Sequence, residues 1–467
     1  MVEIFIEKLY NSDKIKLRSN FMIDKTREIA LKTLYKIDKE KAYSNIVLNE
    51  IIKDNKHVLN DRDIGFISEI VYGTITWKLT IDEIIKKHSN IKLKKISDWI
   101  INILRMGVYQ IVFLDKIPKS AAVNECVNLS KRYGHKFSSK FVNAILRKVE
   151  KKDYEELFEI IDDVERISKV YSIQEWMIRE LLKEKNIKEI EEICKNSNKR
   201  PKLTIRVNNL KITKEKLEKE LIKNNIAFEN GLLDDFLILN KTKNIENLEL
   251  FKNGFFTVQD EAAALTALIL NPKPNQKILD ACSAPGGKTT YMAEIMKNKG
   301  EIDAWDVYEH RLKLVDSSAK RLGIGIIKTK IQDGTKFNTK YIECFDKILL
   351  DVPCLGIGVL KRKPDIKWQR KEEDILEITC LQQDILENCS KYLKKGGELV
   401  YSTCSIFKAE NEEIIEKFLE KNEDFEIQKI EIKRDNYFSK YVENGRYIKV
   451  YQSLETDGFF ICKLQKK

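Results

Sequence analysis

The sequence predicts a multidomain protein: an all-α helical bundle, then a small α+β subdomain, then an α/β domain on a mostly parallel sheet. Two patterns support this order. Apolar residues recur at helical spacing through residues 24–150, whereas strand-like and helical runs alternate from residue 276 onward. In addition, 11 of the 18 glycines lie between Gly254 and Gly397. Backbone turns that need unusual torsions are therefore concentrated in the second half of the chain.

The N-terminal third is expected to be a basic helical domain. Residues 1–23 are predicted to be an extension, with Met22 as an alternative start, and residues 24–150 form the predicted bundle. This bundle carries 24 Lys and Arg against 15 Asp and Glu, whereas residues 151–467 carry 56 against 55. Such an excess attracts nucleic acid, because phosphate contacts release condensed counterions. A generally lysine-rich surface is the alternative, but it would make the rest of the chain basic too.

The middle of the chain predicts a connector and a mixed subdomain. Residues 151–169 begin with an acidic run and are expected to form a connector or an exposed helix. Residues 170–270 form the predicted small α+β subdomain. Strands are expected there at residues 203–207 and 236–239, with a lysine-rich helix at 213–224 between them.

Residues 271–467 form the predicted Rossmann-like domain. Its strands are expected at residues 277–280, 301–306, 326–330, 345–351 and 398–402. Helical segments follow most of these strands, so a mostly parallel sheet covered on both faces is predicted. Ligands bind such sheets at the carboxyl ends of the strands.

Composition argues against several classes of protein. The longest charge-free apolar run near the middle, residues 262–270, is far shorter than the ~18 residues of a membrane helix. Charges interrupt residues 1–20, so no secretory signal is predicted, and we expect a cytoplasmic monomer without a membrane partner. None of the nine cysteines has Cys-x-x-Cys spacing, which argues against a disulfide framework and a zinc ribbon; no metal is expected.

A glycine-containing loop follows the first predicted strand of this domain. It reads Asp280-Ala281-Cys282-Ser283-Ala284-Pro285-Gly286-Gly287-Lys288-Thr289. Gly286 and Gly287 would let backbone N–H groups approach a ligand at a helix N-terminus, although a plain tight turn explains the pair equally well. The Gly-Lys-Thr ending is that of a phosphate loop, but such a loop needs glycine where Cys282 stands, which argues against an NTPase.

Two acidic residues extend the prediction of a nucleoside site. Asp306 ends the second predicted strand 19 residues after Gly287, the spacing at which a carboxylate reaches both ribose hydroxyls. Its alternative role is an N-cap for the helix that starts near Tyr308. Together with the loop, Asp306 favours adenosine binding. Asp333 follows the third strand, where an adenine amino group could be met, and a turn-forming Asp-Gly pair explains it equally well.

Two cysteines lie at the ends of two further strands. Cys354 follows the fourth strand in Asp351-Val352-Pro353-Cys354, and Cys404 follows the fifth in Ser402-Thr403-Cys404-Ser405. If both strands lie beside the first, two thiols and Asp351 face the crevice of the glycine loop. A thiolate is a good carbon nucleophile when nearby donors or cations lower its pKa. Six other cysteines are expected to be inert apolar residues: Cys126, Cys194, Cys344, Cys380, Cys389 and Cys462.

The cysteine and glycine-loop motifs resemble those of the RNA 5-methylcytosine methyltransferases. Residues 254–263 (Gly-Phe-Phe-Thr-Val-Gln-Asp-Glu-Ala-Ala) and 206–208 (Arg-Val-Asn) are similar to that family as well. Segments of the basic bundle resemble the NusB antitermination fold: residues 103–110, 121–125 and 141–147. A NusB-like domain fused to this catalytic domain is the arrangement of the bacterial RsmB (Sun/Fmu) family. The Cys282-Ser283 pair departs from the usual Cys-Ala pair.

The resemblance implies a methyltransferase that uses S-adenosylmethionine to methylate cytosine C5 in 16S rRNA, its RNA partner. It implies that Cys404 is the nucleophile that adds to C6, and that Cys354 assists C5 proton removal and enzyme release. The residues alone do not order these two roles. Asp351 is expected to hydrogen-bond the N3 and N4 edge of the base. The expected cofactor-binding residues are Cys282, Ser283, Ala284, Pro285, Gly286, Gly287, Lys288, Asp306, Asp333 and Asp351.

Two other functions stay open at this point. One is a non-catalytic RNA-binding assembly factor, which the presence of both Cys354 and Cys404 argues against. The other is the same chemistry on tRNA, against which only the N-terminal domain argues. The sequence does not decide whether that domain binds RNA or docks a protein.

Overall fold

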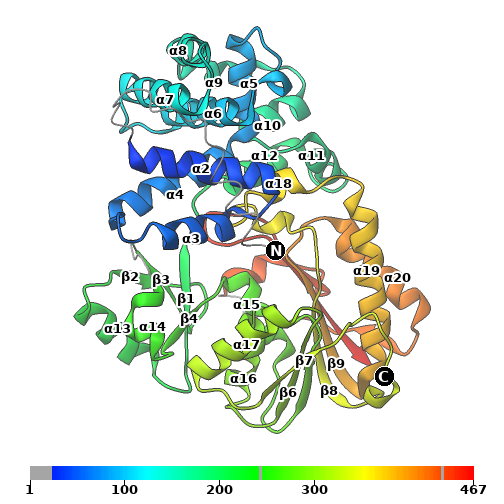
Figure 1. Ribbon diagram of the computed structural model, residues 1–467. Helices are drawn as coiled ribbons and strands as arrows, with labels where there is room; N and C mark the ends of the chain where they lie inside the picture. The colour runs from blue at the N-terminus through cyan, green and yellow to red at the C-terminus, as the bar shows by residue number, and fades with distance from the viewer. Residues whose placement is uncertain (1–23, 241–244, 433–435) are drawn as a thin grey trace, which may run out of the picture. The chain divides into compact units, whose positions relative to one another are not determined.

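The fold is that of a computed structural model, which describes residues 24–240, 245–432 and 436–467 (Figure 1). The extension predicted at residues 1–23 lies outside these ranges. The chain divides into two compact units, Met1–Ile173 and Gln174–Lys467. Within the described ranges, no helix combines the length and the apolar character that crossing a bilayer requires.

The first unit is a bundle of helices, as predicted. Its centre is α6, which is mostly apolar and is buried along most of its length, as expected of a helix surrounded by others. This helix packs against α2, α4, α5, α7 and α8. The helices are α2 (Lys25–Glu40), α3 (Ser44–Asp54), α4 (Asp61–Thr76), α5 (Lys78–His88), η1 (Leu93–Lys95), α6 (Asp98–Phe113), α7 (Lys119–Tyr133), α8 (Ser138–Lys148), α9 (Lys152–Glu155), η2 (Glu156–Glu159) and α10 (Asp163–Tyr171).

The second unit begins with a small α+β subdomain. A four-stranded antiparallel sheet has the order β2-β3-β1-β4. Thr213 caps α13 by accepting a hydrogen bond from the Lys216 N–H, so this helix begins at Lys214. The elements are α11 (Glu175–Leu181), α12 (Ile187–Ser197), β1 (Leu203–Val207), α13 (Lys214–Lys223), β2 (Phe228–Asn230), β3 (Phe236–Leu239), η3 (Ile245–Asn247), α14 (Glu249–Lys252) and β4 (Phe256–Val258).

The larger sheet of this unit is mixed rather than purely parallel. Its order is β11-β12-β13-β9-β8-β5-β6-β7, with β10 paired to β13. The five predicted strands run parallel: β5 (Lys277–Asp280), β6 (Glu301–Asp306), β7 (Ile327–Ile331), β8 (Phe345–Asp351) and β9 (Leu393–Thr403). Four further strands add antiparallel pairs: β10 (Phe425–Ile427), β11 (Val442–Glu443), β12 (Tyr447–Val450) and β13 (Phe459–Lys466).

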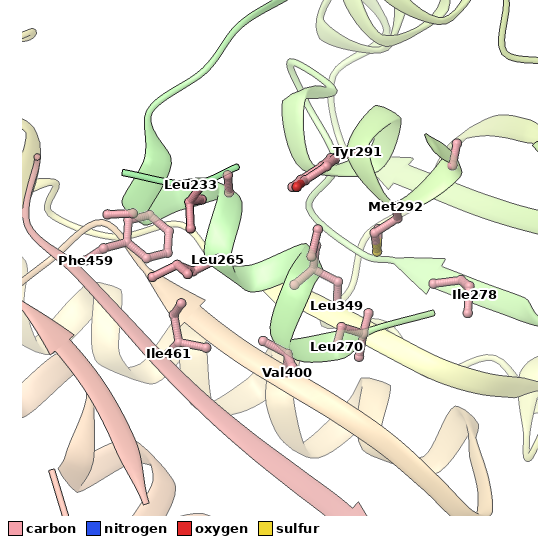
Figure 2. Close-up of a cluster of buried hydrophobic side chains, with 14 of the residues drawn as sticks. Leu233, Leu265, Leu270, Ile278, Tyr291, Met292, Leu349, Val400, Phe459 and Ile461 are labelled. Carbon is pink, nitrogen blue, oxygen red and sulfur yellow. The ribbon is translucent and has the colours of Figure 1, made fainter. Parts of the chain in front are cut away.

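Helices cover both faces of this sheet. Along β8 the side chains alternate: Leu349 joins one apolar cluster, and Ile348 and Leu350 join the other. The first cluster packs against α15 and α16, and Figure 2 shows Leu265 of α15 beside strand residues of this cluster. The second cluster includes residues of α19 and α20. The helices are α15 (Glu261–Leu270), α16 (Gly287–Ile295), α17 (Glu309–Leu322), α18 (Ile366–Gln369), α19 (Asp374–Cys389) and α20 (Glu412–Lys421), with short turns η4 (Thr339–Tyr341), η5 (Ile357–Val359), η6 (Ser390–Tyr392), η7 (Lys408–Glu410) and η8 (Tyr437–Tyr441).

Candidate active site

The strand order reverses at β5, which lies between β6 and β8. A crevice at such a reversal is the usual ligand site of an open α/β sheet. A cavity of about 200 Å³ lies there. Its walls combine the glycine loop with the ends of β4, β5 and β8 and with the start of α15. The lining residues are Val258, Gln259, Ala263, Asp280, Cys282, Ser283, Ala284, Pro285, Gly287, Lys288 and Asp351.

Backbone hydrogen bonds hold the glycine loop against β6. The Ser283 N–H donates to the Trp305 carbonyl over 2.8 Å, and the Gly286 N–H donates to the Ser283 carbonyl over 2.8 Å. Gly286 has φ +100°, and a Cβ there would lie 3.1 Å from Val315 Cα, so both the torsion and the space favour glycine. The loop therefore reaches the start of α16 in a fixed conformation, with Gly287 and Lys288 on the cavity wall.

Asp280 is a cavity residue that the sequence did not single out. Its Oδ2 accepts a hydrogen bond from the Thr289 hydroxyl over 2.7 Å. Its Oδ1 is buried and has no hydrogen-bond partner among the residues that the structure describes. Burial raises the pKa of this carboxyl to about 7. One acceptor is thus left for a ligand donor, and the signal in the sequence was its position at the carboxyl end of β5.

Asp306 is linked to the glycine loop through an arginine. Its Oδ2 lies 3.0 Å from Arg311 Nη1, and Arg311 Nη2 donates to the Ala284 carbonyl over 3.0 Å. Its Oδ1 also accepts the Tyr308 N–H over 3.1 Å. Asp306 is not the N-cap of α17, because Tyr308 occupies that position and no side chain caps the helix. Asp306 is not among the residues that line the cavity.

Asp333 has the geometry of a turn residue. Its Oδ1 accepts hydrogen bonds from the Thr335 N–H over 2.9 Å and from the Thr335 hydroxyl over 2.7 Å. It does not line the cavity either. These contacts are those expected of a turn-forming Asp-Gly pair, the alternative role of Asp333.

The two candidate cysteines lie side by side. Cys354 Sγ and Cys404 Sγ are 2.9 Å apart, although the residues are 50 positions apart in the chain. The pairing of β8 with β9 matches Asp351 with Ser402, which brings the two strand ends together. The hydrogen bond with Cys404, and burial after it, raise the pKa of Cys354 well above its ordinary range.

A lysine connects the glycine loop to the cysteine-bearing strands. Lys288 Nζ lies 2.7 Å from Asp351 Oδ2, and the Ser402 hydroxyl donates to Asp351 Oδ1 over 3.0 Å. Burial opposes the charge of Lys288, but Asp351 and Cys404 outweigh it and raise the lysine pKa. The Lys288 ammonium therefore lies near both Asp351 and Cys404.

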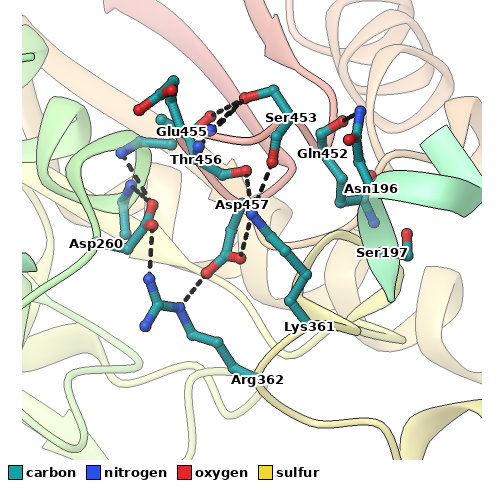
Figure 3. Close-up of polar contacts among 12 residues, drawn as sticks. Asn196, Ser197, Asp260, Lys361, Arg362, Gln452, Ser453, Glu455, Thr456 and Asp457 are labelled. Atoms are coloured by element: carbon teal, nitrogen blue, oxygen red, sulfur yellow. Dashed lines mark hydrogen bonds and ion pairs between the residues drawn. The ribbon is translucent and has the colours of Figure 1, made fainter. Parts of the chain in front are cut away.

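An ionic network fixes the segment that follows Cys354. Arg362 Nη2 lies 3.1 Å from Asp260 Oδ2, and the Arg362 Nε also donates to Asp457. Lys361 Nζ donates to the Thr456 carbonyl over 2.7 Å (Figure 3). Asp260 caps α15, so this network joins that helix to the segment between Cys354 and α18.

Arg206 anchors the small subdomain to the glycine-loop helix, and the sequence did not predict this role. It is fully buried, with Nη2 2.7 Å from Glu294 Oε1 and Nη1 donating to the Gly287 carbonyl over 3.0 Å. Its guanidinium also lies over the Tyr291 ring, 4.4 Å from the centroid. The Arg-Val-Asn motif at 206–208 was the available signal.

Comparisons with known proteins place this architecture. Residues 267–465 match the family described as 16S rRNA methyltransferase RsmB/F, residues 24–151 match the NusB family, and residues 174–246 match the ferredoxin-like domain of RsmF/B-like methyltransferases. The fold and the site therefore define an RsmB/F-class methyltransferase with a NusB-type helical domain.

One relative matches nearly the whole chain. It is the probable ribosomal RNA small subunit methyltransferase B of Bacillus subtilis (strain 168), 38% identical over 443 residues, which are 94% of this chain and 98% of that protein. The chain belongs to the ribosomal RNA small subunit methyltransferase B family. This confirms the predicted family and, with the structure, the predicted fold class.

Two solved structures are similar to this one. The crystal structure of PH0851 superposes with a TM-score of 0.79 at 28% identity, covering 96% of this chain and 100% of that one. The structure of NSun6 from Pyrococcus horikoshii was solved with the S-adenosylmethionine analogue SFG. It has a TM-score of 0.52 at 25% identity, covering 60% of this chain and 94% of that one.

Proposed function

We propose that this protein transfers a methyl group from S-adenosylmethionine to C5 of a cytosine in 16S rRNA, forming 5-methylcytidine. The observation that carries this proposal is the 2.9 Å distance between the Cys354 and Cys404 sulfurs. Strand β8, which leads to Cys354, also supplies Asp351 to the cavity wall. Membership of the ribosomal RNA small subunit methyltransferase B family supplies the class of substrate. We further propose that the protein works as a monomer in the cytoplasm.

S-Adenosylmethionine supplies a methyl group that its sulfonium has already activated. The residues on the cavity wall suit such a group. The backbone of the glycine loop can approach the cofactor, and the Asp280 Oδ1 that has no hydrogen-bond partner can accept a hydrogen bond from its amine. Asp306 is connected to the loop through Arg311, which contacts both Asp306 and the Ala284 carbonyl. Asp333, which is held in its own turn, is the least directly supported of the expected cofactor residues.

Cys404 is assigned to nucleophilic attack on the base. Cytosine C5 is a poor nucleophile, so a thiolate must first add to C6 and give C5 the character of an enamine carbon. Lys288 carries a positive charge near Cys404, which suits a nucleophilic role for that sulfur. Asp351, held by Lys288 and Ser402, is positioned to accept hydrogen bonds from the N4 edge of the base.

Cys354 is assigned to the second half of the reaction. Its hydrogen bond with Cys404 is the largest cause of its raised pKa. Once Cys404 is bonded to C6, that hydrogen bond is lost, while burial still raises the Cys354 pKa. In this assignment Cys354 gives its proton to solvent and then acts as a base. The C5 proton then moves to the Cys354 sulfur, the C5–C6 double bond re-forms, and the Cys404–C6 bond breaks.

The basic helical unit is assigned to RNA binding. Residues 24–150 carry nearly all of the excess positive charge of the chain, and residues 24–151 match the NusB family. The target cytosine must be unstacked to reach the sulfurs, because a helix of A-form RNA hides its base edges.

The test is a methyl-transfer assay with 16S rRNA and tRNA from a strain that lacks this gene. Bisulfite sequencing of the products reports both the RNA and the nucleotide. We expect one methylated cytosine in 16S rRNA with the wild-type protein and none with Cys404→Ala. Cys344→Ala, which changes a cysteine expected to be inert, is the matched control.

Three results would contradict the proposal. Unchanged product with Cys404→Ala would remove the nucleophile. Methylation of tRNA alone would show that the substrate is tRNA and not 16S rRNA. No product from the wild-type protein on either RNA would favour a non-catalytic assembly factor.

A further inference from the structure

One buried carboxylate contacts the residues that directly follow both cysteines. Glu410 ends the turn η7 and is fully buried. Its Oε2 accepts the Leu355 N–H over 2.8 Å, and its Oε1 accepts the hydroxyl of Ser405. Leu355 follows Cys354 and Ser405 follows Cys404, so the two cysteine-bearing segments share one acceptor group.

Gln382 of α19 extends the same contact to the other side of Cys354. Its Nε2 donates to Glu410 Oε2 over 3.1 Å and to the Pro353 carbonyl over 2.9 Å. The residues on both sides of Cys354 are thus tied to Glu410, directly or through Gln382. The Gly358 N–H also donates to the Cys404 carbonyl over 2.9 Å, which adds a direct link between the two segments.

The turn that carries Glu410 is itself fixed to the end of β9. The Tyr401 hydroxyl donates to the Glu410 carbonyl over 2.7 Å. The Thr403 hydroxyl lies 2.6 Å from Asn411 Oδ1, and Asn411 Nδ2 donates to the Ser405 carbonyl over 3.1 Å. Burial raises the pKa of Glu410, and its three hydrogen-bond donors oppose that rise. A rigid acceptor on a rigid turn can fix the position of what it binds.

We propose that Glu410 is a positioning residue that holds the Cys354 and Cys404 sulfurs at the separation the methyl transfer requires. The inference rests on the proposed function for its effect on activity. The proposed effect of Glu410 on the distance between the two sulfurs does not depend on that function.

The variant that tests this is Glu410→Met, which keeps most of the side-chain volume and removes both acceptors. We expect kcat to fall by roughly 10- to 100-fold, because small misplacements of reacting groups have effects of that order. The KM for RNA and the affinity for S-adenosylmethionine should stay within about twofold, since Glu410 contacts the cysteine segments and not the glycine loop. Glu410→Gln keeps an acceptor for Leu355, and the Ser405 hydroxyl can turn to accept, so this variant should recover most of the activity.

Glu412→Met is the matched control. Glu412 is a second buried glutamate two residues along the chain, but it lies 2.8 Å from Lys449 Nζ and does not contact the cysteine segments. Both variants remove a buried carboxylate and are expected to lower the melting temperature. Only Glu410→Met should lower kcat when both are assayed well below their melting temperatures.

A second measurement reports the separation of the sulfurs without RNA. With limiting hydrogen peroxide, the two thiols lose two protons and two electrons and form one disulfide, while the peroxide becomes two water molecules. Peptide mass spectrometry follows the Cys354–Cys404 disulfide over time. We expect wild type and Glu412→Met to form it at similar rates, and Glu410→Met to form it at least about fivefold more slowly, because bridging requires closely placed sulfurs. If Glu410→Met does not fold, Gln382→Met, which leaves the carboxylate and loosens only the Cys354 side, should show a smaller loss in both assays.

The outcomes separate the two proposals. Wild-type kcat and disulfide rate in folded Glu410→Met, or in Gln382→Met where that variant replaces it, would overturn the positioning role. No methyl transfer by the wild-type protein, together with slow disulfide formation in the variant, would leave the geometry standing and remove the proposed function.

Discussion

Lys288 Nζ lies 2.7 Å from Asp351 Oδ2, so an ion pair joins the start of the glycine-loop helix to the strand that leads to Cys354. The same ammonium lies over the ring of Phe459, 5.0 Å from its centroid, and near enough to Cys404 for that sulfur to raise the lysine pKa. One side chain therefore joins the glycine-loop helix to Asp351 and lies near Cys404.

Replacing this lysine should slow the chemical step. In Lys288→Met the Cys404 sulfur loses its nearby cation and Asp351 loses its ion pair, so we expect single-turnover methyl transfer to fall by roughly 10- to 100-fold. Lys299→Met, which changes an exposed lysine, is the control. An unchanged rate for Lys288→Met would contradict the electrostatic role.

Removing Cys354 should trap the enzyme on its RNA. Without this thiol, the C5 proton is not removed efficiently, so the Cys404–C6 bond persists after methyl transfer. We expect Cys354→Ala, incubated with 16S rRNA and S-adenosylmethionine, to give an SDS-stable band of reduced mobility. The double variant Cys354→Ala/Cys404→Ala should give none. Absence of the band from the single variant would count against the assignment of the release step to Cys354.

Local patterns predicted the five parallel strands of the larger sheet, including its edge strand β7, but missed several antiparallel strands. The strands β5, β6 and β8 fall at the predicted residues, and each is a short strand-like run that ends at an aspartate. The strands β2, β4 and β10 have three residues each, too few for a period to be recognised. Strand β13 is longer, but it pairs with β9, a distant neighbour that no local pattern reveals. The mixed character of the sheet follows from these missed strands.

The same limit applies to the site. Cys354, Cys404 and the glycine loop could be predicted, because they follow strands whose ends must meet at one edge. Arg206 and Glu410 could not be given a role, since each acts through partners that only the folded chain brings near. Arg206 contacts Glu294, 88 residues away, and Glu410 contacts Leu355, 55 residues away.

Asp280 should make stability depend on pH near neutrality. Burial raises its folded-state pKa to about 7, whereas the unfolded chain has an ordinary carboxyl pKa of about 3.9. Between these values the folded protein holds a proton that the unfolded chain has lost, so stability falls as the pH rises from about 4 to about 7. Asp280→Asn removes this contribution. The melting temperature of the variant relative to wild type should therefore be higher at pH 8 than at pH 5.

Glu261 also has a pKa raised to about 7, so the wild-type curve alone does not isolate Asp280. The difference in melting temperature between Asp280→Asn and wild type, followed against pH, isolates Asp280 because Glu261 is present in both proteins. A difference that does not change with pH would contradict the assignment.

The buried Arg206–Glu294 pair should tie stability to the cofactor loop. Arg206→Met leaves the Glu294 carboxylate buried without its cation, and breaking such a pair from one side costs about 3–5 kcal/mol. The double variant Arg206→Met/Glu294→Met should recover most of that loss in urea unfolding, since no charge is left uncompensated. The double variant still lacks the hydrogen bond to the Gly287 carbonyl. We therefore expect its affinity for S-adenosylmethionine, measured by calorimetry, to stay below that of wild type even when its stability is restored. If affinity returned together with stability, Arg206 would support the fold alone and would not hold the glycine loop for the cofactor.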